Sequence, residues 1–583
     1  MKKFTFLFLS VLLLFSYAGI AQTVLVVQPG VGTLNAAIKA NGGNAIYQLK
    51  AGEWYQLDAI IENVDYHLQI IGQEPAVKGG KPATLQTGSD AGGAVFGMMF
   101  DAKGDLTLKN IYLVNADLTG VIGNGLITNS AADARTVVDK CVIDPVGLNY
   151  CVNLTASNSK TYFTNNLALR HGHQLNPNDG HFFITDNASG AGFDSLLVQN
   201  NTFVCMGTTM HASGFTKFVN NFSKWDHNTF VEQKSQIDWS NFEKEYYWTN
   251  NLMFDVQTQP WNTPWQPMPG ADAGYPKPCL IYADTIPGDV FPSKTIQFVE
   301  YNMHYRNPKF YTLVDELNVQ GKADGKTKIY LMPIVWPIDS AGISRETKMF
   351  ADDASFPFWK YGNTTKEVDP KWVDTRIYAM SDKLVEWTKP ATQIHAMGYP
   401  SDNFPPASQW AQWHWDPDGD VSNNATWPVF NGVYTNAAML TGSIEGLPLG
   451  DLNWYPESMT KWAKNKTKID AHLKAANDSK IDITTGVQLI NSSNISTSYY
   501  PNPFSGELTI SYTVKNPASI RLSIVNITGQ TVNELVNQSK AAGSYTAKWN
   551  GKNAEGKSLS NGIYFYKLQI GNEVITNRIV KLK

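Results

Sequence analysis

The chain has 583 residues, enough for several domains or for one long solenoid with a further module. Its net charge of −4 argues against nucleic acid as a partner, and its four cysteines are too few for a disulfide scaffold. Charged residues make up only 17% and aromatic residues 12%, which suits sugar recognition because aromatic rings stack on the apolar faces of sugars. Any single tryptophan is nevertheless more often part of a core.

Residues 1–21 have the features of a secretory signal peptide. Two lysines follow Met1, the stretch from Phe4 to Tyr17 is almost wholly apolar, and small residues come next. We therefore expect cleavage after Ala21 and export to the periplasm. No later run is apolar for long enough to cross a bilayer, so we expect no membrane span in the mature protein.

Residues 22–260 begin with a short helix followed by strands. The helix is expected at Leu34 to Ala40, and strands are expected within Tyr47–Leu57 and Leu68–Gly72. A capping helix followed by strand, glycine, aromatic residue and strand resembles the start of right-handed parallel β-helices of the pectin-lyase-like superfamily. The resemblance implies a solenoid in which each coil pairs its short strands with those of its neighbours.

A short pattern then recurs at intervals typical of solenoid coils, roughly 20–50 residues. Asparagine tolerates the left-handed conformation, so the doublets at 165–166, 200–201, 220–221 and 250–251 predict turns whose amides hydrogen-bond from coil to coil. Phe203 and Phe230 hold the same place in successive copies, which predicts buried and stacked rings. A more distant copy is Asn302–Arg306. The regular copies, each a polar residue followed by an apolar run, are Asn110–Val114, Lys140–Asp144, Asn166–Arg170, Asn201–Cys205, Asn228–Glu232 and Asn251–Asp255.

The last residues of these copies should stack in one column, because neighbouring strands lie about 4.8 Å apart. A core column would be apolar throughout, whereas this one changes from apolar to charged, which predicts a groove that faces solvent. The resemblance to β-helix polysaccharide lyases and hydrolases implies that the catalytic residues lie on such a face. In chain order, the column contains Val114, Asp144, Arg170, Cys205, Glu232 and Asp255.

Two mechanisms could use the side chains in and beside this column. A lyase acting on a uronic acid needs a cation to neutralise the carboxylate and a base to remove a proton, roles that arginine, lysine and histidine can fill. A hydrolase needs two carboxylates across the glycosidic bond, and Glu232 with Asp255, Asp226 or Asp238 meets that need. The candidates for catalysis are Arg170, His171, Glu232, Lys234 and Asp255, and those for substrate binding are His173, His211, Trp261 and Trp265.

No diagnostic lyase motif is present, and each of these residues could instead be a solvated or loop-anchoring side chain. A non-catalytic glycan-binding or adhesive surface protein is therefore the alternative function. His171, His173 and His181 also invite a zinc hypothesis, since histidines two positions apart on a strand share a face, although the spacing fixes no third ligand.

Residues 261–483 are rich in tryptophan and proline and lose the period, which predicts a loop-rich extension packed on the β-helix. A helix is expected from Glu457 to Ala476, with Trp462 and Ile469 among its apolar positions. Residues 484–498 are rich in serine, threonine and asparagine and are the expected linker.

One acidic stretch of the extension suggests a cofactor. Carboxylates alternate at Asp416, Asp418 and Asp420, a spacing that suits the oxygen ligands of Ca²⁺. The stretch lacks the glycine and glutamate positions of an EF-hand loop, so a plain turn capped by aspartate is the alternative.

Residues 499–583 are expected to form a small antiparallel sandwich, because alternating runs such as Leu508–Tyr512 and Arg521–Ile524 are separated by glycine and asparagine turns. The opening Tyr500-Pro-Asn-Pro-Phe504 and the end at Lys581-Leu-Lys583 resemble the C-terminal sorting domain of Bacteroidota cargo of the type IX secretion system. The resemblance implies the type IX machinery as a partner and a location at the cell surface or in the medium.

The sequence thus predicts an all-β protein: a right-handed parallel β-helix, a loop-rich region after it and a C-terminal β-sandwich. The functional hypothesis is a secreted or cell-surface protein that acts on or binds a polysaccharide. A lyase of uronic-acid glycans is the first form of that hypothesis, and a glycan-binding protein without catalysis is the second.

Overall fold

The structure is a computed structural model. The residues that it describes are 23–77, 79–172, 180–185, 192–207, 210–212, 220–233, 238–240, 243–256, 258, 260–261, 281–283, 296–323, 330–331, 359–362, 365–388, 429–477, 497–500, 504–514, 516–526, 530–571 and 573–582. The expected signal peptide lies outside these residues.

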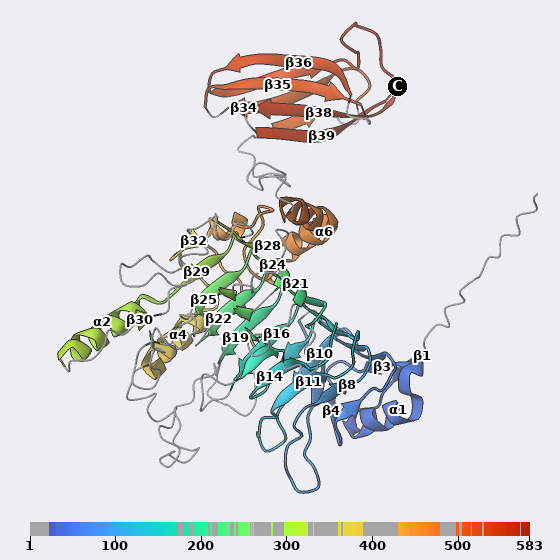
Figure 1. The fold of residues 1–583 in the computed structure, drawn as a ribbon. Coiled ribbons are helices and arrows are strands. Elements are labelled where there is room, and N and C mark those ends of the chain that lie inside the picture. The colour runs from blue at the N-terminus through green and yellow to red at the C-terminus, as the bar shows by residue number, and fades with distance from the viewer. Residues whose placement is uncertain are drawn as a thin grey trace, which may run out of the picture.

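Three sheets of parallel strands run the length of the first part of the chain (Figure 1). Sheet A contains β1 (Thr23–Val26), β3 (Ala45–Leu49), β6 (Leu68–Gly72), β9 (Leu106–Lys109), β12 (Arg135–Asp139), β15 (Lys160–Thr164), β18 (Ser195–Gln199), β21 (Asn220–Asp226), β24 (Glu243–Thr249), β28 (Ile296–Glu300) and β31 (Trp359–Gly362).

Sheet B contains β2 (Gly30–Val31), β4 (Trp54–Gln56), β7 (Ala83–Gln86), β10 (Ile111–Val114), β13 (Val142–Ile143), β16 (Leu167–His171), β19 (Thr202–Met206), β22 (Thr229–Gln233), β25 (Leu252–Val256), β29 (Met303–Tyr305) and β32 (Thr365–Lys366). Sheet C contains β5 (Ile61–Glu62), β8 (Phe100–Ala102), β11 (Gly125–Asn129), β14 (Tyr150–Leu154), β17 (His181–Ile184), β20 (His211–Ala212), β23 (Asp238–Ser240) and β27 (Ile281–Ala283).

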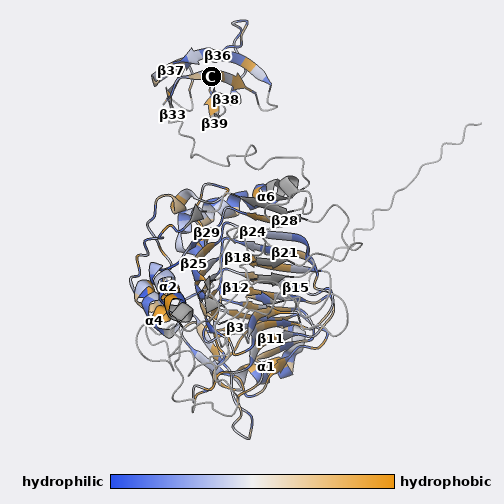
Figure 2. Cartoon of the chain, turned by 60° about the vertical axis from the view of Figure 1, so that its left-hand side comes forward, coloured by the Kyte–Doolittle hydropathy of each residue, from blue (hydrophilic) through white to orange (hydrophobic). Residues whose placement is uncertain are grey.

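The chain visits the sheets in turn, so each coil adds one strand to sheet A and one to sheet B, most coils add one to sheet C, and each strand pairs with the strand one coil away. This is the stacked arrangement of a β-helix, and its strands appear as successive rungs in Figure 2. The expected capping helix is α1 (Thr33–Asn41), which buries Leu34 and Ile38 against the first coils. The fold class predicted from the repeats is confirmed.

An asparagine ladder lies at the turn from sheet A to sheet B. The side-chain amide of Asn166 donates to Asn201 Oδ1 (3.1 Å), and the same bond continues through Asn228 and Asn251 to Asn302. The residue before each ladder asparagine is left-handed, as Asn165 is with a φ of 59°. The coil-to-coil bonding expected of the asparagines is confirmed, and the distant copy at Asn302 belongs to the regular stack.

Two details of the expected repeat are wrong. The doublet at 220–221 is not a ladder turn, because it opens strand β21. The copies at 110–114 and 140–144 are in register with each other but are both shifted by one residue against the later copies, since Val142 pairs with Tyr112 and with Leu167. The backbone N–H of Cys141 donates to Asn166 Oδ1 at 2.8 Å. Cys141 therefore occupies the ladder position, and the equivalent of Lys140 in the next coil is Asn165.

Aromatic side chains fill the core between the sheets. Phe203 and Phe230 pair in register on β19 and β22, are fully buried, and stack with ring centroids 5.1 Å apart. Phe230 stacks in turn on Trp248 of β24, at 5.4 Å. The prediction that the two phenylalanines form stacked, buried rungs is confirmed.

The β-helix continues beyond residue 260, where the sequence pattern placed its end, because β27, β28, β29, β31 and β32 extend all three sheets. A small antiparallel pair, β26 (Pro260–Trp261) with β30 (Tyr330–Leu331), accompanies these last coils. The extension also contains α2 (Pro308–Ala323), α4 (Arg376–Thr388) and α6 (Pro456–Asn477), of which only α6 was expected.

The extension covers the outer faces of two sheets. Apolar side chains of α2, α4 and residues 429–449 form a second core on the outer face of sheet B, against Val204, Val231 and Phe254. Helix α6 packs Trp462 and Ile469 beside Tyr247 and Phe298 on the outer face of sheet A, near β21, β24 and β28 (Figure 1).

The C-terminal part is an antiparallel sandwich with a core of its own. One sheet has the order β33 (Thr497–Tyr500), β34 (Leu508–Val514) and β37 (Gly543–Trp549); the other has β36 (Thr531–Lys540), β35 (Ala518–Val525), β38 (Gly562–Ile570) and β39 (Glu573–Lys581). The expected sandwich is confirmed. Among the described residues, none of the helices combines the length and apolarity that a bilayer crossing requires.

Candidate functional site

The charged column predicted from the repeats lies within sheet B, at the next-to-last residue of strands β16, β19, β22 and β25. Arg170, Cys205, Glu232 and Asp255 all adopt the left-handed conformation there, with φ between 51° and 59°. Glu232 and Asp255 are fully buried, and the Arg170 side chain is only 10% exposed. The expectation of a solvent-facing groove is therefore wrong for this column.

Buried partners account for the charges in the column. Arg170 forms a hydrogen-bonded ion pair with the fully buried Asp144. Burial alone would lower the pKa of Arg170, but Asp144 reverses that effect and raises it. Glu232 Oε2 lies 3.3 Å from the Cys205 thiol. These are contacts of a packed interior, and no open surface is needed to explain them.

Asp255 ties the column to the extension. Its carboxylate accepts from Ser381 Oγ of α4 at 2.5 Å and from the backbone N–H of Asn307 at 2.6 Å. Burial raises the pKa of Asp255 to about 7, against the lowering effect of these hydrogen bonds. Sequence reasoning did not predict that the extension covers Asp255, because Ser381 lies 126 residues further along the chain.

The remaining predicted residues are dispersed or undescribed. His171 is buried on β16, with Nδ1 3.0 Å from the carbonyl oxygen of Gly147. His211 is buried on β20, with Nδ1 3.6 Å from Glu243 Oε1. Trp261 lies on β26, and nothing is described of its side chain. Residues outside the described part of the chain are Lys234, His173, Trp265, Asp416, Asp418 and Asp420.

Metal sites and disulfides were left open by the sequence. No cluster of histidine, cysteine and carboxylate side chains within the described ranges could hold a metal ion. Cys141, Cys151 and Cys205 are buried free thiols, so Cys141 and Cys151 do not pair. The Ca²⁺ loop expected around Asp418 stays a prediction.

An open cleft lies elsewhere, between the outer face of sheet A and helix α6. It encloses about 420 Å³. Tyr162 of β15, Leu197 of β18, Lys224 of β21 and Tyr247 of β24 follow one another in register along its floor. Beside them runs the register column of Ser195, Phe222 and Glu245, and α6 contributes Lys466 and Asp470.

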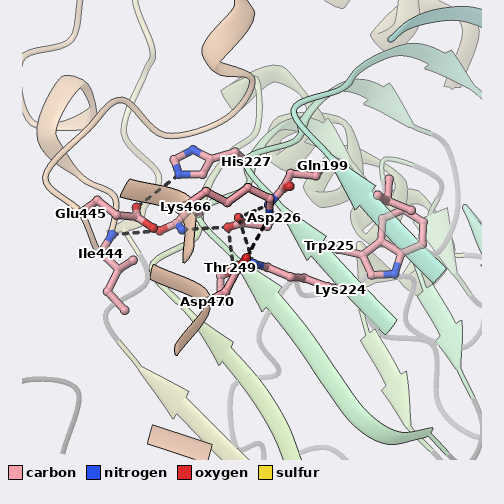
Figure 3. Close-up of polar contacts among 12 residues, drawn as sticks. Gln199, Lys224, Trp225, Asp226, His227, Thr249, Ile444, Glu445, Lys466 and Asp470 are labelled. Carbon is pink, nitrogen blue, oxygen red and sulfur yellow. Dashed lines mark hydrogen bonds and ion pairs between the residues drawn. The ribbon is translucent and has the colours of Figure 1, made fainter. Parts of the chain in front are cut away.

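Three charged side chains of the cleft are paired, and the pair of Lys224 with Asp470 joins sheet A to α6 (Figure 3). Lys224 Nζ lies 2.8 Å from Asp470 Oδ1 and 3.6 Å from Asp226 Oδ2, while Lys466 Nζ lies 3.1 Å from Asp470 Oδ2. Burial lowers the pKa of Lys224, but the two aspartates outweigh it and raise the value, so the amine stays charged.

A second set of buried contacts fixes the segment that leads into α6. His227 Nε2 lies 3.3 Å from Glu445 Oε2 (Figure 3). The backbone N–H of Ile444 donates to Asn250 Oδ1. Asp451 accepts from Thr202 Oγ1 at 2.8 Å. Residues 443–454 are thus bonded to three coils, which positions α6 as the wall of the cleft.

Sequence reasoning missed every residue of this cleft. Its two walls are far apart in the chain, since Lys224 and Asp470 are separated by 246 residues. One signal was present: Tyr162 on β15 and Phe222 on β21 are large aromatic residues at outward positions two strands apart, and they can be recognised as a pair once the strand order is known.

Comparison with known proteins identifies the C-terminal sandwich. Residues 498–582 match the family described as "Secretion system C-terminal sorting domain". The sorting domain expected from the motifs is thereby shown. It indicates a secreted or cell-surface protein and implies the secretion machinery as a partner. No curated protein matches the chain.

Two solved structures show partial likenesses. One is dimeric latent PorU from Porphyromonas gingivalis, at 17% identity and a TM-score of 0.14, covering 16% of this chain and 10% of that chain. The other is the PL6 family alginate lyase AlyGC, at 16% identity and a TM-score of 0.28, covering 40% of this chain and 36% of that chain. Both likenesses are too low to assign a function.

Proposed function

We propose that this exported protein binds a polysaccharide in the cleft between sheet A and α6. The observation that carries the proposal is the pair of half-buried aromatic side chains, Tyr162 of β15 and Phe222 of β21, on the floor of a cavity of about 420 Å³. The ring of Tyr247 lines the same floor but is only 4% exposed. Flat aromatic faces offer large apolar contact areas, and the polar groups around them can bond to sugar hydroxyls. The volume lies within the range of ligand pockets, roughly 300–1,000 Å³.

The spacing of the coils supports an extended ligand. Tyr162 and Phe222 lie on β15 and β21, two strand steps apart in sheet A. At about 4.8 Å a step, the two side chains are separated by roughly 10 Å along the stack. A monosaccharide is too short to reach both, whereas a chain of several sugars that follows the stack contacts both rings.

Binding is tested with the purified full chain in affinity electrophoresis and calorimetry against a panel of soluble polysaccharides. Tyr162→Ala should weaken binding of the best polysaccharide about tenfold, equivalent to ~1.4 kcal/mol. Phe222→Ala should act in the same direction. Tyr500→Ala is the matched control, because Tyr500 is 65% exposed on β33 of the sorting domain. Failure of the parent protein to bind any polysaccharide would reject the proposal, and unchanged binding in both cleft variants would reject the site.

A lyase of uronic-acid polysaccharides is the second candidate function. The observation that favours it is the adjacency of Arg170 and His171 on β16, since elimination needs a cation at the carboxylate and a base at the neighbouring carbon. In this hypothesis Lys234 and His173 assist, and Glu232 and Asp255 lie further along the same column. It ranks second because Arg170 is paired with Asp144 and nearly buried.

The lyase hypothesis has its own assay. Elimination leaves an unsaturated sugar, so product formation is followed by ultraviolet absorbance during incubation with uronic-acid polymers. His171→Asn keeps a polar group toward Gly147 and removes the imidazole, so it should abolish any product. Arg170→Ala is not a clean probe, because it leaves the buried Asp144 unpaired, which destabilises proteins by about 3–5 kcal/mol. No product from any uronic-acid polymer would exclude this function.

A further inference from the structure

We propose that the cleft selects an uncharged polysaccharide and discriminates against uronic-acid polymers. The inference rests on the proposed function of the cleft and adds the chemical class of its ligand. It follows from how the charges of the lining are distributed and bonded.

The cleft is lined by equal numbers of positively and negatively charged side chains. Two cations, Lys224 and Lys466, face two carboxylates, Glu245 and Asp470. Asp226 lies directly behind Lys224 and is fully buried. Burial would raise the pKa of Asp226, but Lys224 and His227 lower it, so the carboxylate is ionised and the surroundings of the cleft are slightly negative.

Both cations are already occupied by carboxylates of the protein. Lys224 and Lys466 share Asp470, one amine on each oxygen, at 2.8 Å and 3.1 Å. A carboxylate on a sugar would have to displace Asp470 from both amines and would then lie beside a second negative charge. Juxtaposed like charges are how interfaces reject the wrong partner.

An uncharged sugar chain makes no such demand. Its hydroxyls donate to carboxylate oxygens and accept from amines while the protein's own ion pairs stay intact. Asp470 and Lys466 are 43% and 36% exposed, so they stand at the open side of the cleft, and Lys224, at 7%, lies at its floor. The apolar faces of neutral sugars then lie on the half-buried rings of Tyr162 and Phe222.

The test is a single substitution that should remove the discrimination against anionic polysaccharides. Asp470→Asn keeps the shape of the side chain and removes the charge that occupies both lysines. The matched control is Asp315→Asn, which removes one negative charge from an exposed position on α2. Affinity is measured for neutral probes, unsubstituted glucan, mannan and xylan, and for the anionic probes alginate and polygalacturonate, at low and high salt.

The parent chain should bind at least one neutral probe, with weak salt dependence, and bind neither anionic probe. Asp470→Asn should raise the affinity for an anionic probe at least about tenfold at low salt, and high salt should remove the gain because exposed charges are screened. Asp315→Asn should leave the affinity for an anionic probe unchanged. Thermal unfolding checks that each variant is folded.

The outcomes separate the two proposals. Binding of an anionic probe by the parent chain, as tight as that of any neutral probe and lost in high salt, would overturn the selectivity while leaving polysaccharide binding intact. A gain in Asp315→Asn equal to that in Asp470→Asn would also overturn it, because the effect would then come from overall charge. Absence of binding to both classes of probe would overturn the proposed function itself, together with the selectivity that rests on it.

Discussion

Removal of the Phe230 ring is the sharpest test of the coil alignment. The side chain is fully buried and lies between Phe203, at 5.1 Å, and Trp248, at 5.4 Å, with nearly parallel rings on both sides. Burying a phenylalanine removes about 150 Å² from water, which at ~25 cal/mol per Å² is worth about 4 kcal/mol. Phe→Ala substitutions in cores cost about 3–5 kcal/mol, in agreement with this figure.

The site should lie in the upper half of that range, because its neighbours cannot move into the space. Phe203 and Trp248 belong to strands that are hydrogen-bonded to further strands on each side, so the cavity stays open. Phe230→Leu retains most of the volume and should cost clearly less. Phe222→Ala, on the half-buried outer face of sheet A, is the control and should cost less than either.

Urea unfolding followed by tryptophan fluorescence provides the measurement, with Trp225 and Trp248 as reporters in the same part of the core. A lower midpoint at unchanged slope identifies a change in stability. If Phe230→Ala cost less than about 1 kcal/mol, as surface substitutions do, the stacked core would be wrong. A loss of stability in Phe222→Ala as large as that in Phe230→Ala would contradict it as well.

Three further predictions address export, the ladder and pH. Deleting residues 499–583 should leave the protein in the periplasm with its main domain folded, and unchanged amounts in the medium or at the surface by immunoblotting would contradict this. Asn228→Ala should cost about 2 kcal/mol or more in urea unfolding, because it leaves buried partners of its amide on both neighbouring coils unsatisfied, whereas the surface variant Asn221→Ala should cost little. The pKa of Asp255 is raised to about 7 in the folded state, above the unfolded value of about 3.9. Its contribution to the free energy of unfolding is therefore full below pH ~4 and is lost as the pH rises through about 7. Asp255→Asn should therefore weaken the fall in melting temperature between these pH values, and an identical pH profile in the variant would refute the assignment.

The repeat of the β-helix could be predicted because asparagine occupies the turn from sheet A to sheet B in successive coils. Asn166, Asn201, Asn228 and Asn251 each repeat the same bond, so the sequence carries the coil boundary directly. The alignment was wrong by one residue where asparagine is replaced, because Cys141 holds the ladder position and has no side-chain amide.

The later coils were harder to recognise because the chain between them lengthens. Asn251 and Asn302 are bonded neighbours in the ladder but lie 51 residues apart in sequence. An interval of that length hides the strand β28 from a search for a regular period and leaves β29 recognisable only as the distant copy at Asn302–Arg306. Their register with β24 and β25 is nevertheless uninterrupted.

Exposure of the charged column could not be predicted at all. Which face of a β-helix is open depends on segments that return from far along the chain, and Asp255 is covered by Ser381 and Asn307. Charged residues at a repeated position were interpreted as solvent-facing because isolated buried charges are costly. Here they are buried with partners, such as Asp144 for Arg170, that the sequence does not link to them.

The extension therefore decides which face of the solenoid can bind a ligand. Its residues 429–449 bury the outer face of sheet B, and the contacts of His227 with Glu445 and of Thr202 with Asp451 then direct the chain across the turn to sheet A. There α6 covers the last coils and leaves a cleft beside them. The coils supply a flat, regular array of outward side chains. Helix α6 supplies the wall and the carboxylate of Asp470, which pairs with Lys224 and so keeps it from binding an anion. Specificity in such a protein can change through the extension alone, without any change in the coils, and Asp470 is the position where one substitution is expected to do so.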